Sequence, residues 1–156
     1  MARLRRRRHQ QRPDESASPT RPFLFDGLSP WASGHHLECE VGERIIDLHG
    51  DASFRSCAYL ADEKLQLKWH YGNDLSPREP ELVTMTFFGV RDLVLTQDRD
   101  LHPDCREDTG GWHFQPGDDG FAHLDVSAGE MEVSFRAMGV HLILEPVAAP
   151  SSEAPA

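Results

Sequence analysis

The sequence predicts an all-β domain, an antiparallel meander that forms a curved sheet or a small open barrel of seven to nine strands. Two observations predict this class. Apolar and polar residues alternate at a period of two, most clearly from Gly111 to Glu145. Turn signals rich in Gly, Pro and Asp separate the alternating runs, as they do between strands of an antiparallel sheet. No segment shows a sustained helical period.

The first half of the expected sheet consists of hairpins. Gly89 falls between two apolar strand runs, where it marks a bulge or a sharp bend. A charged turn, Ala61-Asp62-Glu63-Lys64, joins two alternating runs into the clearest hairpin. Six strands are expected before the meander, over residues 36–41, 44–48, 53–60, 65–71, 81–88 and 90–95.

The meander itself allows the strand registers to be worked out. A two-residue loop at Ala128-Gly129 sets Leu124 opposite Val133, so that apolar residues meet apolar residues. A second turn at Ala137-Met138 makes the last strand a hairpin partner of the strand before it. The first turn, near Gly117 to Gly120, requires an odd-length loop or a bulge.

The opposite face of the meander is polar. The same registers place His113, His123, Ser134 and His141 in one transverse row. Directly paired residues lie about 5 Å apart, and histidine is a common zinc ligand. His113, His123 and His141 are therefore candidate ligands for zinc or another transition metal, and apart from this alternative no cofactor is expected. The competing interpretation is a polar face that meets water.

Charge divides the chain into a basic tail and an acidic body. Residues 1–21 hold seven arginines and two acids, so the totals of 16 and 26 leave nine basic and 24 acidic residues in the remainder. We expect a disordered tail over residues 1–21, one domain over residues 22–146 and a disordered end over residues 147–156. The acidic body disfavours nucleic acid and suits a basic protein partner. Arg5, Arg6, Arg7 and Arg8 leave open a nucleic-acid contact through the tail.

Signatures of enzymes and of export are missing from the chain. There is no Gly-rich phosphate loop, no HExxH and no G-x-S-x-G, so no catalytic residue is predicted. Cys39, Cys57 and Cys105 form no CxxC pair. No apolar stretch approaches the length of a membrane span or of a signal peptide, and we expect a cytoplasmic protein.

A resemblance adds to this interpretation. The order of a hairpin, a loop, the run from Val83 to Leu93 and a meander that ends in Leu142-Ile143-Leu144-Glu145 resembles small β-rich families of unknown function. Some of these are grouped with immunity proteins of bacterial polymorphic-toxin systems. Members of that group often carry His-Asp before the first long strand, where this chain has His49-Gly50-Asp51. The resemblance implies a non-enzymatic protein that binds another protein, such as a toxin, and it implies no catalytic residues.

Overall fold

The computed structural model describes residues 22–72, 79–97 and 109–147. Within these ranges the chain forms twelve β-strands and no helix, which confirms the all-β prediction. The strands are β1 Leu24–Asp26, β2 Gly34–His36, β3 Glu38–Val41, β4 Arg44–Asp47, β5 Ala52–Leu60, β6 Lys64–Tyr71, β7 Glu81–Phe88, β8 Arg91–Gln97, β9 Thr109–Pro116, β10 Ala122–Ala128, β11 Met131–Ala137 and β12 Gly139–Pro146.

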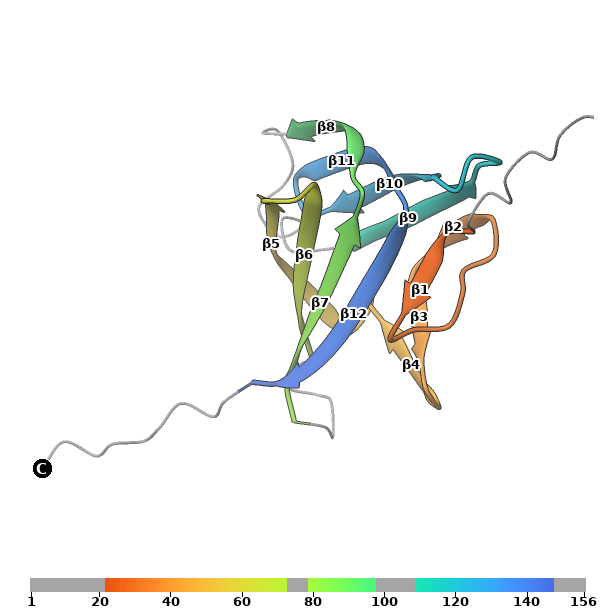
Figure 1. Ribbon diagram of the computed structural model, residues 1–156. Helices are drawn as coiled ribbons and strands as arrows, with labels where there is room; N and C mark the ends of the chain where they lie inside the picture. The colour runs from red at the N-terminus through yellow and green to blue at the C-terminus, as the bar shows by residue number, and fades with distance from the viewer. Residues whose placement is uncertain (1–21, 73–78, 98–108, 148–156) are drawn as a thin grey trace, which may run out of the picture.

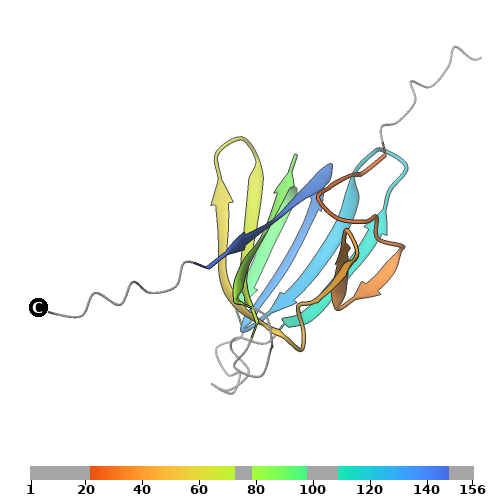
Figure 2. The same ribbon diagram turned by 90° about the horizontal axis from the view of Figure 1, so that it is seen from below.

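Ten of these strands are divided between two sheets of five. The first sheet has the order β1-β12-β7-β6-β5 and the second has the order β2-β9-β10-β11-β8. Strands β3 and β4 form a separate two-stranded ribbon, which lies beside β1 on the side of the molecule away from β5 (Figures 1 and 2). All pairs are antiparallel except β1 with β12, which is parallel. Each sheet has two edge strands, so neither closes on itself.

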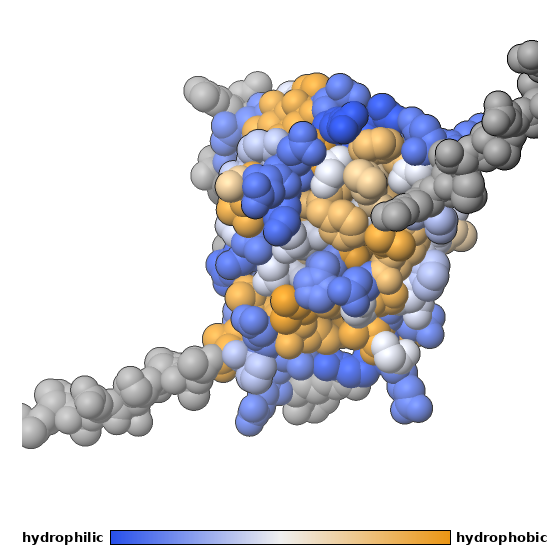
Figure 3. All heavy atoms as spheres, viewed as in Figure 1, coloured by the Kyte–Doolittle hydropathy of each residue, from blue (hydrophilic) through white to orange (hydrophobic). Residues whose placement is uncertain are grey.

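The core lies between the inner faces of the two sheets. On β6, Leu65, Leu67 and Trp69 are buried, as the period of two predicts. Phe87 of the first sheet meets Phe135 of the second edge to face, with ring centroids 4.9 Å apart. Other buried residues that line this core are Val83, Met85, Trp112, Phe114, Leu124, Val126, Val133, Val140 and Leu142. On the face of the molecule seen in Figure 3, apolar patches alternate with hydrophilic ones.

The chain passes between the two sheets twice at one corner. β7 pairs with β12 in the first sheet, and their continuations β8 and β11 pair in the second. Gly89, with φ of 63°, makes the bend between β7 and β8. The bend between β11 and β12 is at Met138, whose backbone N–H donates to the Phe88 carbonyl at 2.9 Å. The predicted hairpin of β11 with β12 is therefore wrong, because the chain leaves the second sheet at Met138.

The registers of the meander differ from the predicted ones by two residues. Leu124 lies opposite Phe135 on one side and opposite Phe114 on the other. The turn between β10 and β11 is centred on Gly129-Glu130, and Gly129 has φ of 59°, which glycine adopts without strain. A slip of two keeps every side chain on its face. The predicted buried and exposed faces are therefore right although the partners are not.

The remaining strand predictions agree with the structure. The hairpin of β5 with β6, the strand β7 and the ribbon of β3 with β4 all form where they were expected. The loop from Gly117 to Phe121 between β9 and β10 has an odd length, as the alternation required. The short strands β1 and β2 were not predicted, and the twelve strands of the described residues exceed the expected seven to nine.

Candidate functional site

The three candidate metal ligands do not form a row. His113 on β9 lies opposite His35 of β2 and Asp125 of β10. His123 lies opposite Gln115 and Arg136. The predicted row failed for the two reasons given above, the slip of two residues in the hairpins and the departure of β12 to the first sheet.

His141 lies in the first sheet, where its imidazole contacts Asp26 of β1. Its Nδ1 is 2.6 Å from Oδ2 of Asp26, and both side chains are substantially exposed. Within the described ranges, no group of three or more His, Cys, Asp or Glu side chains is placed to hold a metal ion. Arg5, Arg6, Arg7 and Arg8 lie outside the described residues.

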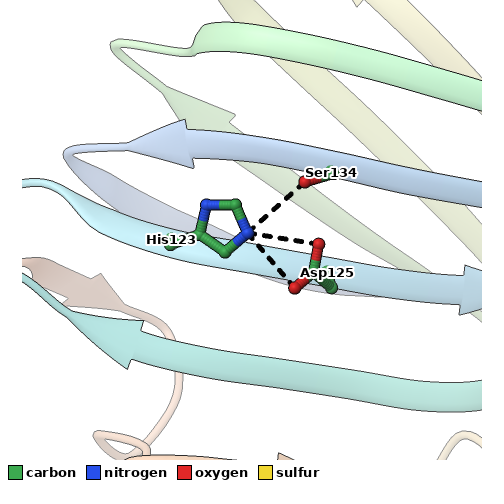
Figure 4. Close-up of polar contacts among 3 residues, drawn as sticks. All are labelled: His123, Asp125 and Ser134. Atoms are coloured by element: carbon green, nitrogen blue, oxygen red, sulfur yellow. Dashed lines mark hydrogen bonds and ion pairs between the residues drawn. The ribbon is translucent and has the colours of Figure 1, made fainter.

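His123, Asp125 and Ser134 share one polar cluster on the exposed face of the second sheet (Figure 4). Nε2 of His123 lies 3.2 Å from both Asp125 carboxylate oxygens and 3.4 Å from the Ser134 hydroxyl. In a Ser-His-Asp triad the serine and the carboxylate contact different imidazole nitrogens, so that the base can accept the serine proton. Here a single nitrogen faces both partners, and the cluster does not have the geometry of a nucleophile with its base.

A different surface gathers uncompensated charge, and the ribbon of β3 and β4 builds it. Glu38 lies opposite Asp47 and Glu40 lies opposite Ile45, so these four side chains share one face of the ribbon. We call this set the acidic face. The other face carries Cys39 and Ile46, which are 2% and 0% exposed and join the core. Ile45 is 60% exposed, so the acidic face surrounds an isoleucine open to solvent.

The only basic side chain of the ribbon does not neutralise this face. Arg44 forms a two-bonded ion pair with Glu81 of β7, with Nη1–Oε1 and Nη2–Oε2 distances of 3.0 and 2.6 Å. Hydrogen bonding to the Glu81 carboxylate raises the pKa of Arg44. Among the described residues, no Lys or Arg forms an ion pair with Glu38, Glu40 or Asp47. The acidic face therefore keeps its negative charge.

A small cavity opens between the acidic face and the segment that precedes β2. Its volume is about 200 Å³, and the backbone N–H of Ser29 joins this segment to the ribbon by donating to the Glu40 carbonyl at 2.8 Å. The lining residues are Ser29, Pro30, Trp31, Ala32, His36, Glu38, Cys39, Glu40 and Ile45.

Aromatic packing fixes the wall of this cavity. Trp31 is 8% exposed and its ring centroid lies 5.3 Å from those of Phe25 and Trp112. The buried Nε1 of Trp31 has no hydrogen-bond partner among the described residues. His36 Nε2 lies 2.6 Å from the Ala32 carbonyl, and because a carbonyl only accepts, this nitrogen is the donor.

The described thiols have the properties of structural rather than nucleophilic cysteines. Burial, and secondarily the charge of Glu38, raises the pKa of Cys39 to about 12. Burial also raises the pKa of Cys57. A thiol nucleophile needs a lowered pKa, so neither is poised for catalysis. Cys105 lies outside the described residues.

Sequence reasoning predicted an acidic body but missed the place where the charge gathers. Period-two alternation in Glu38-Cys39-Glu40 was the available signal, because it places both carboxylates on one face. Trp31 gave no such signal, since its position beside the ribbon depends on tertiary packing.

Comparison with known proteins adds no relative, because no family model, no curated protein and no solved structure matches this chain. In the part of the chain that the structure describes, no helix is long and apolar enough to cross a membrane.

Proposed function

We propose that this protein binds a basic protein partner through the acidic face. The observation that carries the proposal is the arrangement of Glu38, Glu40 and Asp47 around the exposed Ile45, while Arg44 is held by Glu81. Three carboxylates on one small face attract a positively charged surface and repel a phosphate backbone.

The mixture of charge and apolar area suits protein recognition. Ile45 provides apolar surface that a partner would bury, and the carboxylates around it would orient the partner and accelerate the encounter. The resemblance to immunity proteins supports a narrower form of the proposal, in which the partner is a basic toxin and the complex forms in the cytoplasm. The alternative of a metal site at His113, His123 and His141 stays a prediction, and a shared row does not support it, because His141 lies in the other sheet.

The test compares two pairs of charge reversals. Tagged wild-type protein, the variant Glu38→Lys/Glu40→Lys and the control Glu132→Lys/Glu145→Lys are used to capture proteins from the source cell extract. The control changes net charge by the same amount at exposed positions of β11 and β12. Any protein captured by the wild type and by the control, but not by the Glu38→Lys/Glu40→Lys variant, is purified for titration.

Direct titration by calorimetry then decides the proposal. We expect a basic protein whose affinity falls at least about tenfold in Glu38→Lys/Glu40→Lys, and whose association slows as salt is raised. If Glu38→Lys/Glu40→Lys and the control Glu132→Lys/Glu145→Lys lose binding equally, only the net charge of the protein matters. A partner insensitive to Glu38→Lys/Glu40→Lys would place the binding surface elsewhere.

A further inference from the structure

The cavity beside the acidic face combines carboxylates, an aromatic wall and a buried donor without a partner. We infer that it receives an arginine residue of the basic partner, with the guanidinium between Glu38 and Glu40. This inference rests on the proposed function, since it names the residue of that partner that the site recognises.

The size of the cavity favours a side chain over a cofactor. Its volume is about 200 Å³. Pockets for drug-sized ligands and cofactors are larger, about 300–1,000 Å³. A guanidinium with part of its aliphatic stem is of the right order, and the exposed Ile45 at the rim offers that stem an apolar contact.

The spacing of the carboxylates favours arginine over lysine. Glu38 and Glu40 are alternate residues of β3 and line the same cavity, which sets their Cα atoms about 7 Å apart along the strand. A guanidinium carries five N–H donors in a planar fork and can donate to two carboxylates at once, whereas an ammonium is a single compact charge. The ring of Trp31 adds an aromatic wall of the kind on which guanidinium groups stack.

The indole of Trp31 supplies a second, independent requirement. Its Nε1 is buried and has no acceptor among the described residues, and Trp31 lines the cavity. A buried donor without an acceptor is costly, so a ligand gains affinity if its entry brings an acceptor within reach of this nitrogen. An arginine residue in a peptide brings a cation for the two carboxylates and a backbone carbonyl that can serve as an acceptor.

The experiment uses N-acetyl-arginine-amide as the probe and full-length protein labelled with nitrogen-15. Titration is followed through the indole N–H resonance of Trp31, assigned by its disappearance in Trp31→Phe. N-acetyl-citrulline-amide, which has nearly the same shape without charge, and N-acetyl-lysine-amide serve as the comparison ligands. The protein variants are Glu38→Gln/Glu40→Gln and the control Glu132→Gln/Glu145→Gln, all at exposed positions.

We expect saturable movement of the Trp31 indole resonance with the arginine probe and none with citrulline. Affinity falls about tenfold in Glu38→Gln/Glu40→Gln and is unchanged in the control. Equal affinity for the lysine probe, an unchanged affinity in Glu38→Gln/Glu40→Gln, or the absence of binding would each overturn the inference.

Failure here is distinguishable from failure of the proposed function. Suppose that a purified basic partner loses affinity for Glu38→Lys/Glu40→Lys, but binds wild type and Trp31→Phe equally and is not displaced by the arginine probe. This result would support the acidic face as the binding surface and contradict the arginine site in the cavity. If the probe binds but no basic protein partner is found, the arginine site in the cavity would be supported and the proposed protein partner would not.

Discussion

The indole N–H of Trp69 donates to the hydroxyl of Thr109 at 2.8 Å, and both residues are almost completely buried. Trp69 belongs to β6 of the first sheet and Thr109 to β9 of the second. The bond therefore joins the two sheets through the core, and the same Thr109 accepts from Nδ1 of His49 through its carbonyl at 2.5 Å. A polar link at this depth fixes how the sheets sit against each other.

Thr109→Val tests this link at constant shape. The substitution removes the acceptor and leaves the Trp69 N–H buried without a partner, which costs about 1–3 kcal/mol of unfolding free energy. Urea denaturation measures the loss. Thr109→Ser retains the hydroxyl and is expected to lose less, and Thr96→Val on exposed β8 is expected to change stability by no more than about 0.5 kcal/mol. A Thr109→Val protein as stable as wild type would show that the bond contributes nothing.

The corner between the sheets depends on a glycine beneath an aromatic ring. A Cβ added at Gly139 would lie only 2.1 Å from Cζ of Phe88, so Gly139→Ala must displace the ring or the backbone. We expect a loss of about 1–3 kcal/mol, as for other overpacked sites. A double-mutant cycle with Phe88→Leu checks the cause by urea denaturation, because the smaller side chain relieves the clash. Additive losses would mean that Phe88 is not the obstacle.

The same corner shows where prediction from sequence stopped. Period-two alternation placed Leu124, Val133 and Phe135 on the inner face correctly, because side-chain direction depends only on parity. It could not set the partner, since any even slip keeps apolar residues together. Ala137-Met138 has the spacing of a hairpin turn, and only the pairing of β7 with β12 shows that the chain changes sheet there.

The candidate site was predictable to the same extent. Alternation in the ribbon sequence indicates that Glu38 and Glu40 face one way and Cys39 the other, as the structure confirms. The capture of Arg44 by Glu81, 37 residues later in the chain, leaves no local signal. The short strands β1 and β2 were missed for a related reason, because three residues are too few to show a period and each pairs with a strand far along the chain.

Acid should weaken the fold through Asp119. Its pKa is lowered first by the hydrogen bond from the Phe121 backbone N–H and then by the contact with Arg136. A lowered folded-state pKa adds stability above the unfolded value of about 3.9, and this stability is lost as pH falls through the folded value. In urea titrations, Asp119→Asn should therefore be less stable than wild type at pH 6, with the difference shrinking as the pH falls below the unfolded value. The control Asp118→Asn should parallel wild type, and an equal pH dependence in both variants would contradict the role of Asp119.

Cys39 should resist alkylation while the protein is folded. Its pKa of about 12, against an ordinary value of 9.0, leaves roughly a thousandfold less thiolate at pH 8. Iodoacetamide labelling followed by peptide mass spectrometry should find Cys39 unmodified in the native protein and modified in urea, with the half-buried Cys57 as the internal comparison. Because the folded-state pKa is raised, the stability associated with this thiol is present below pH 9 and is lost as pH rises from there toward 12. The substitution Cys39→Ala should remove that alkaline loss. Rapid labelling in native buffer would instead mean that the ribbon of β3 and β4 opens readily and exposes the inner side of the acidic face.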